Sequence, residues 1–224
     1  MQTSLDFQYI IELLPILIKY LGVTMEMAFL GFFFALILAL VMAIVRVFKL
    51  PVANQLASLF ISFFRGTPLL VQLFLLYYGL PQLLPIFAGM DAFSAAVLGL
   101  SLHFSAYMAE SIRAAILGID KSQMEACFSI GMTRLQAMRR IILPQASRVA
   151  TPSLMNYFID LIKSTSLAFT LGVAEIMAKA QMEAASSFKF FESFLAVALV
   201  YWVVVMFFTR IQHLLEIRLN KAYS

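Results

Sequence analysis

The sequence predicts an all-α integral membrane protein that crosses the bilayer with five helices and forms a single domain over residues 1–224. Composition is the first reason. Of all residues, 62% are hydrophobic and 12% are charged, with a mean hydropathy of +0.93, whereas soluble domains have about 45–50% and 25%. The second reason is a set of apolar stretches of roughly 20 residues, the length that spans a bilayer. The third is an unequal distribution of Lys and Arg between the connecting segments.

Five stretches are long and apolar enough to span. They cover about residues 24–45, 56–80, 93–117, 150–173 and 191–210. Each is expected to be a helix, because backbone groups in lipid must be satisfied within the segment and the alternating pattern of barrel strands is not visible. The segment Phe7–Tyr20 is shorter and contains Glu12, Pro15 and Lys19, so it is predicted to be an amphipathic helix at the membrane interface.

The Lys and Arg side chains predict the orientation. When the connections are assigned alternately to the two sides, 11 of the 16 Lys and Arg residues fall on one side and three on the other, while Arg65 and Lys163 lie inside spans. The richer side is predicted to be cytoplasmic, which puts the N-terminus outside and the C-terminus inside. The odd span count does not fit an inverted repeat within one chain, so a second subunit is expected. The net charge is +4, but the positive charges lie beside apolar runs, which indicates the cytoplasmic ends of spans and not a nucleic-acid-binding surface.

The connection between the third and fourth spans, about residues 118–149, is the longest polar one. Apolar residues recur in it at helical spacing, Gly131 interrupts the pattern, and Pro144 is expected to end it. A connection of this length in a compact domain is usually functional. The pattern by itself leaves open an amphipathic helix that only rests on the membrane surface, anchored by Arg139 and Arg140.

A spaced motif lies in this connection. It consists of Glu125, Ala126, Cys127, Gly131, Ile141, Leu143 and Pro144. It resembles the EAA signature of ATP-binding-cassette (ABC) importer permeases: Glu-Ala-Ala, three residues, Gly, nine residues, Ile, one residue, Leu-Pro. Cys127 departs from the signature, although it is small like the usual alanine. Segments 64–82, 100–116 and 156–177 resemble the second, third and fourth spans of polar amino-acid permeases of the histidine, glutamine, arginine and cystine group, and the C-terminal half is most like the cystine type.

The resemblance implies a type I ABC importer permease in a bacterial inner membrane. In that family the loop forms a coupling helix that contacts a separate ATPase. Two ATPase subunits, a second permease (an identical copy or a paralogue) and an extracytoplasmic amino-acid-binding protein are the implied partners, besides membrane lipid. The sequence has no G-x-x-x-x-G-K-[ST] loop, so ATP and magnesium are expected on the partner and this chain is not expected to be an enzyme. Glu125 is expected to cap a helix or form an ion pair locally, or to reach the ATPase.

Several polar side chains lie within predicted spans, where one charge at the bilayer centre costs about 2.5–3.5 kcal/mol. Candidates for the substrate path are Gln72, His103, Tyr107, Asn156, Asp160 and Lys163. Depth along the helices places His103 and Asp160 near the midplane, where they could meet. A network that only locks the helices together explains the same residues equally well for Asp160 and Asn156. For Arg65, Pro68 and Glu110 a structural or gating role is favoured.

Two other classes of protein are alternatives to an ABC permease. An ATPase-independent channel or secondary transporter disagrees with the odd span count and the motif spacing, and a sensor or scaffold with a relict permease fold is the second alternative. No metal site is predicted, because His103 has no second His or Cys spaced to join it. The segment Met177–Met182 is expected in an external loop, which either contacts the binding protein or is simply solvated.

Overall fold

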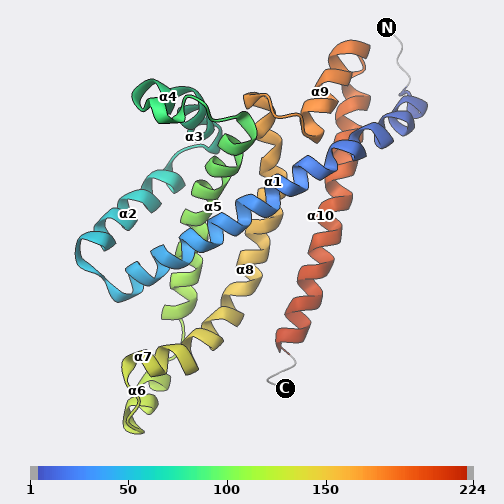
Figure 1. Ribbon diagram of the computed structural model, residues 1–224. Coiled ribbons are helices and arrows are strands. Elements are labelled where there is room, and N and C mark those ends of the chain that lie inside the picture. The colour runs from blue at the N-terminus through green and yellow to red at the C-terminus, as the bar shows by residue number, and fades with distance from the viewer. Residues whose placement is uncertain (1–4, 221–224) are drawn as a thin grey trace.

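The computed structural model describes residues 5–220 and contains only helices over that range (Figure 1). The all-α prediction is therefore confirmed. The elements are α1 (Phe7–Phe48), α2 (Pro51–Gly66), α3 (Leu69–Phe74), a π-helical turn (Leu75–Gly79), α4 (Leu80–Leu83), a 3-10 turn (Pro85–Phe87), α5 (Ala92–Leu117), α6 (Lys121–Ser129), α7 (Arg134–Ala137), a second π-helical turn (Met138–Ile142), α8 (Leu143–Ser164), a second 3-10 turn (Thr165–Leu171), α9 (Ile176–Ser187) and α10 (Phe190–Asn220).

Among the described residues, α1, α5 and α10 are each long and apolar enough to cross a membrane alone. Two further candidate spans are broken. α2 meets the segment Leu69–Leu83 at 113°, and the segment Arg134–Leu171 meets α9 at 53°. Five spans result when each bent pair counts as one. The single helix predicted over about residues 56–80 is wrong, because α2 ends at Gly66 and α3 begins at Leu69. Pro68 causes the first break, because it lacks an N–H and restricts Thr67 to extended backbone (φ −122°, ψ 149°).

α1 is one continuous helix of 42 residues, so the separate interfacial helix predicted for residues 7–20 is wrong. At 1.5 Å per residue it is roughly 63 Å long, about twice the hydrocarbon thickness of a bilayer. Figure 1 shows it running obliquely across the bundle. Protein contacts explain the continuity, because the buried Leu13 and Leu17 pack against Ile176 of α9 and against α10. This apolar face is therefore covered by helices and not by lipid headgroups.

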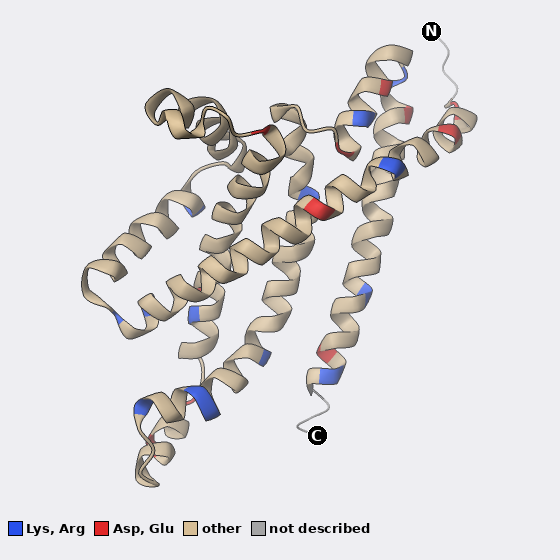
Figure 2. Cartoon of the chain, viewed as in Figure 1, with Lys and Arg blue, Asp and Glu red and all other residues tan. Residues whose placement is uncertain are grey.

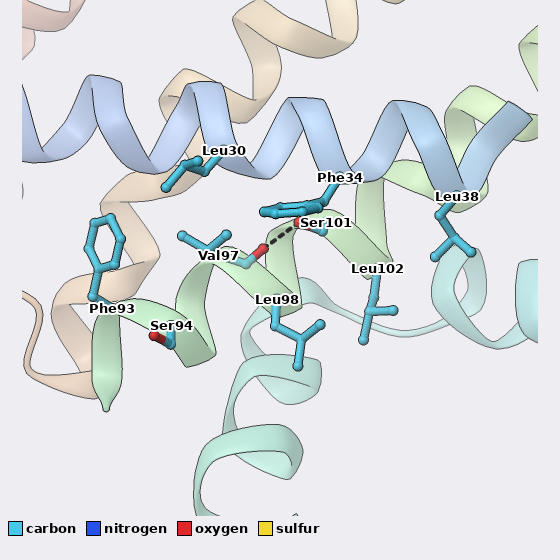
Figure 3. A pocket seen from close by; sticks show the side chains of 9 residues that line it. All are labelled: Leu30, Phe34, Leu38, Phe93, Ser94, Val97, Leu98, Ser101 and Leu102. Atoms are coloured by element: carbon cyan, nitrogen blue, oxygen red, sulfur yellow. Dashed lines mark hydrogen bonds between the residues drawn. The ribbon is translucent and has the colours of Figure 1, made fainter. Parts of the chain in front are cut away.

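Small side chains allow α1 and α5 to pack closely, as is usual for helices in a bilayer. The small buried positions of α1 recur every three or four residues and include Ala28, Gly31, Ala35 and Ala39. From α5, the hydroxyl of Ser101 lies 3.2 Å from the carbonyl oxygen of Gly31 and donates at 2.6 Å to that of Val97. Beside this contact lies an apolar groove of about 420 Å³, shown in Figure 3.

Gly99 of α5 permits a second close contact, which yields a prediction. A Cβ added at Gly99 would lie 2.5 Å from Cδ2 of the buried Leu73. Gly99→Ala is expected to destabilise the protein by about 1–2 kcal/mol, because the core must shift to admit the methyl group. Thermal unfolding in detergent measures the effect. Gly22→Ala is the control, since nothing lies within 4 Å of its Cβ position. The loss should shrink in a Leu73→Ala background; an undiminished loss there would contradict the assigned clash.

Two of the three later spanning helices are longer than predicted. α8 begins at Leu143, ahead of the predicted residue 150, and α10 continues past residue 210, whereas α5 agrees with residues 93–117. The segment Met177–Met182 belongs to α9 and is not a loop. Hydropathy marks only the apolar part of a helix, because a helix can continue into water wherever its residues favour that conformation.

Candidate functional site

The end of α6 follows directly from its local sequence. The N–H of Gly131 donates to the carbonyl of Phe128 at 2.9 Å, and the N–H of Met132 donates to the carbonyl of Cys127 at 3.0 Å. This pair of bonds is the Schellman motif, which satisfies the last carbonyls of a helix. It needs a residue in the left-handed region, and Gly131 has φ +78°. Cys127 is buried beneath the turn, at 4% exposure.

The starts of α6 and α7 are also capped. Asp120 caps α6 by accepting a hydrogen bond from the N–H of Ser122 at 2.9 Å, and that bond lowers the pKa of the Asp120 carboxyl. Thr133 and Gln136 form a reciprocal capping box at the start of α7, with bonds of 2.8 and 3.3 Å. Helix, turn and helix are therefore joined with their backbone groups largely satisfied. We call α6, the turn and α7 the hairpin.

The hairpin presents apolar side chains to its surroundings. Phe128 is 49% exposed, Ile130 77% and Leu135 71%. Figure 2 shows Lys and Arg residues on and beside this end of the molecule. Glu125 and Ala126 are exposed on α6, and Glu125 has no ion pair within residues 5–220, so the predicted local pairing or capping by Glu125 is wrong. Exposed apolar groups with a charged surround are typical of a surface that binds a partner.

The helix does not end at Pro144, contrary to the prediction. The N–H of Leu143 bonds to the carbonyl of Met138, five residues earlier, which closes a wide π-helical turn. Pro144 then lies in the first turn of α8, where its missing N–H costs little. Ile141 belongs to the π-helical turn. The hairpin is thus continuous with α8 through to Ser164, and α8 is part of a candidate membrane span.

Gln72 holds the bend between α2 and α3. Its Nε2 donates to the carbonyl of Phe64 at 2.9 Å and to the carbonyl and hydroxyl of Thr67 at 3.0 and 2.8 Å. Its Oε1 lies 2.9 Å from Nδ1 of His103 on α5, so the imidazole donates. Gln72 is only 4% exposed. It therefore satisfies carbonyls that Pro68 leaves without helical partners, and it ties the bend to α5.

Aromatic rings continue this cluster along α5. The guanidinium of Arg65 lies 5.4 Å from the ring centroid of Tyr107, and the hydroxyl of Tyr107 lies 3.5 Å from the Arg65 carbonyl oxygen. The ring of Tyr107 also lies 5.0 Å from that of His103 and 6.1 Å from that of Tyr157 on α8. Among the predicted site residues, Gln72, His103, Tyr107 and Arg65 thus form one group at the bend.

Glu110 lies one turn further along α5 and makes two ion pairs. Its carboxylate is 2.7 Å from the guanidinium of Arg113 and 3.5 Å from that of Arg46 on α1. Arg46 also donates to the hydroxyl of Ser58 on α2. Glu110 therefore connects α5 to α1 and, through Arg46, to α2. These ion pairs compensate the negative charge of Glu110 inside a span, so no ligand is needed to explain it.

A second polar group lies on α8 and faces α10. Asn156, Asp160 and Lys163 share the exposed face of α8, and the ammonium of Lys163 lies 2.6 Å from the Asp160 carboxylate. Their side chains line a cleft of about 540 Å³ together with residues of α10 that sequence reasoning missed, namely Thr209, Gln212, His213 and Glu216. The sequence does contain a pattern that could have indicated them, because these four polar positions recur at the three- and four-residue spacing of one helical face.

The expected meeting of His103 and Asp160 does not occur. Within residues 5–220, His103 is hydrogen-bonded to Gln72 and its ring lies against those of Phe104 and Tyr107, whereas Asp160 lines the cleft beside α10. Equal depth along two helices does not fix the direction in which each side chain points. Within the same range, no three His, Cys, Asp or Glu side chains are grouped to hold a metal ion.

Ionisable groups inside candidate spans are a mark of a polar path, and exposed apolar groups are a mark of a surface that binds a partner. Membrane components of transport systems combine the two features. The chain belongs to the family of binding-protein-dependent transport system inner membrane components, whose model matches residues 31–221. It is 75% identical over 218 residues to the probable amino-acid ABC transporter permease protein PatM of Vibrio harveyi, covering 97% of this chain and 98% of that one.

Two further proteins extend this likeness. The L-cystine transport system permease protein TcyL of Bacillus subtilis is 40% identical over 225 residues, covering 99% of this chain and 94% of that one. Among solved structures, an amino acid ABC transporter with histidines matches with a TM-score of 0.88 at 34% identity, covering 96% of this chain and 100% of the other. The prediction of an ABC importer permease is confirmed.

Proposed function

We propose that this chain is the permease subunit of an ATP-driven importer for polar amino acids, with cystine or a cationic amino acid as cargo. The exposed hairpin is the observation that carries the proposal, because it offers a rigid apolar contact that is continuous with α8. The names of its amino-acid and cystine permease relatives support the cargo class.

The proposed assembly contains two ATPase subunits, a second permease and an extracytoplasmic binding protein. The chain has no phosphate-binding glycine loop, which supports placing ATP and magnesium on the ATPase. A short contact helix is a sufficient route for work, because rigid-body motion of the hairpin displaces α8 as a unit. The excess of Lys and Arg near the hairpin supports a cytoplasmic hairpin and C-terminus, with the N-terminus outside.

The cleft beside α8 is the proposed cargo path. Asp160 and Lys163 have side chains that are 51% and 54% exposed, on a helix that contributes to a candidate span. Facing lipid, each charge would cost about 2.5–3.5 kcal/mol, so water or a second permease must cover them. A zwitterionic amino acid carries the same two charges as this ion pair. Its ammonium group could replace Lys163 at Asp160, while its carboxylate pairs with Lys163.

Uptake into proteoliposomes tests the function. The permease, its ATPase and the binding protein are reconstituted together, and uptake of labelled cystine, arginine, glutamine and histidine is measured with and without ATP. ATP-dependent uptake of at least one is expected. Uptake that persists without the ATPase would favour the channel or secondary transporter. Assembly of the complex without uptake of any of them would favour the sensor or scaffold.

Substitution of the cleft residues gives a separate prediction. Asp160→Asn and Asn156→Ala are each expected to raise the KM of uptake about tenfold, since losing one hydrogen bond to a charged group costs roughly 1.5–3 kcal/mol. Thermal unfolding should change little, because both side chains are exposed. Thr151→Ala is the control on the same helix; its hydroxyl donates to the carbonyl of Ser147 at 2.7 Å. Unchanged KM in both variants would remove these residues from the path.

A further inference from the structure

An apolar cavity lies where α1, α5 and the segment from α7 to α8 meet. Its volume is about 260 Å³. α1 contributes Ile44 and Phe48, α5 contributes Ile116, and the α7–α8 segment contributes Leu135 and Arg139. None of these side chains belongs to the polar groups at the bend or in the cleft. The cavity is therefore separate from the proposed cargo path.

The cavity has a basic rim. Arg139 lines it, the guanidinium of Arg134 lies 5.5 Å from the ring centroid of Phe48, and Lys49 follows Phe48 directly at the end of α1. These three side chains are exposed, and no acidic side chain within residues 5–220 forms an ion pair with them. Arg46, by contrast, is engaged by Glu110. The rim thus carries uncompensated positive charge beside an apolar hollow.

The cavity is also continuous with an apolar stripe on α1. Ile37, Leu40, Val41 and Ile44 are all exposed and recur every three or four residues, so they form one stripe that ends at Phe48. A stripe of this kind on a spanning helix faces hydrocarbon. It ends at Phe48 and is followed by Lys49, and a cationic residue at the end of an apolar stripe is typical of the change from acyl chains to headgroups. The apolar stripe leads into the apolar cavity, and the cavity leads to the basic rim. A phospholipid has the matching order, since its acyl chain is followed by its charged headgroup.

We propose that this cavity binds an anionic phospholipid of the leaflet on the hairpin side. An acyl chain lies along the stripe and enters the cavity, and the headgroup phosphate pairs with Lys49, Arg134 and Arg139. Basic pockets between spanning helices on the cytoplasmic side are known binding sites for anionic headgroups. The assignment to the cytoplasmic leaflet rests on the orientation given under the proposed function, whereas binding itself does not. A lipid here would contact both α1 and the hairpin, and so would influence the coupling contact.

Native mass spectrometry of the full-length permease in detergent tests the site. Phosphatidylglycerol and phosphatidylcholine with identical acyl chains compete for retention, without the ATPase or binding protein. Preferential retention of phosphatidylglycerol is expected. The double variant Arg134→Gln/Arg139→Gln should reduce that preference about tenfold. The control Arg210→Gln/Arg218→Gln removes two charges from α10 and should leave it unchanged. A wild-type preference in the first double variant would overturn the proposal.

A second variant tests the hollow without changing charge. Val47 also lines the cavity, and Val47→Phe fills it. Retention of both lipids should fall several-fold while the preference between them persists, and circular dichroism and size-exclusion chromatography confirm that the variant is folded. Unchanged retention in a folded variant would show that no acyl chain enters the cavity. Added ATPase should leave the lipid bound; its complete displacement would assign this face to the ATPase instead and overturn the proposal. Because this readout needs no uptake, it fails independently of the transport function.

Discussion

Replacing Gly131 with valine is expected to abolish ATP-driven uptake while leaving the membrane-spanning bundle intact. Gly131 has φ +78°, a left-handed conformation that costs an ordinary residue about 1–2 kcal/mol and a β-branched residue more. Valine would move the turn out of this region and break the Schellman bonds to Phe128 and Cys127. The hairpin would then present Ile130 in another direction. Uptake and retention of the ATPase on the permease both measure the loss.

Matched variants separate conformation from bulk. Nothing lies within 4 Å of the Cβ position at Gly131, so steric crowding does not explain the expected defect. Gly131→Asn should retain much of the uptake, because asparagine tolerates the left-handed region better than other residues. Gly22→Ala is the neutral control. Full uptake by Gly131→Val would mean that coupling does not depend on the shape of this turn.

The hairpin is the part of the molecule that sequence predicts best, because its causes are local. Gly131 follows the last turn of α6 and Thr133 precedes Gln136 by three residues, so both caps depend on neighbours in the chain. The apolar stretch of each spanning helix is likewise visible from consecutive residues. Those features could be predicted without knowing how the helices are arranged.

Several of the errors elsewhere concern contacts between distant segments. α1 continues through the predicted interfacial helix because α9 and α10 cover its N-terminal part. His103 turns toward Gln72, which is needed to satisfy carbonyls at a bend that hydropathy does not show. The α10 side of the cleft was missed because Gln212, His213 and Glu216 lie beyond the apolar window, which ends at residue 210. Position along a helix can be counted from the sequence, but the direction of each side chain depends on neighbours from other helices.

Glu175 is another residue that sequence reasoning passed over, and it joins three helices. Its side chain is fully buried. One oxygen caps α9 by accepting from the N–H of Ala178 at 2.8 Å, and the other accepts from the hydroxyl of Tyr201 on α10 at 3.0 Å. The hydroxyl of Thr24 on α1 lies 3.5 Å from the same oxygen and 3.4 Å from the N–H of Ile176. This network fixes the bend before α9 against α1 and α10.

Glu175→Ala is therefore expected to lower the free energy of unfolding by about 3 kcal/mol, because it removes a helix cap and leaves a buried hydroxyl without an acceptor. Chemical denaturation in mixed micelles measures the change. Glu183→Ala is the control on the same helix; its ion pair with Lys179 at 2.7 Å is partly exposed and should contribute under about 1 kcal/mol. In a Tyr201→Phe background Glu175→Ala should cost less, since the hydroxyl is already absent. Equal losses for Glu175→Ala and Glu183→Ala would show that the buried network does not hold the bend.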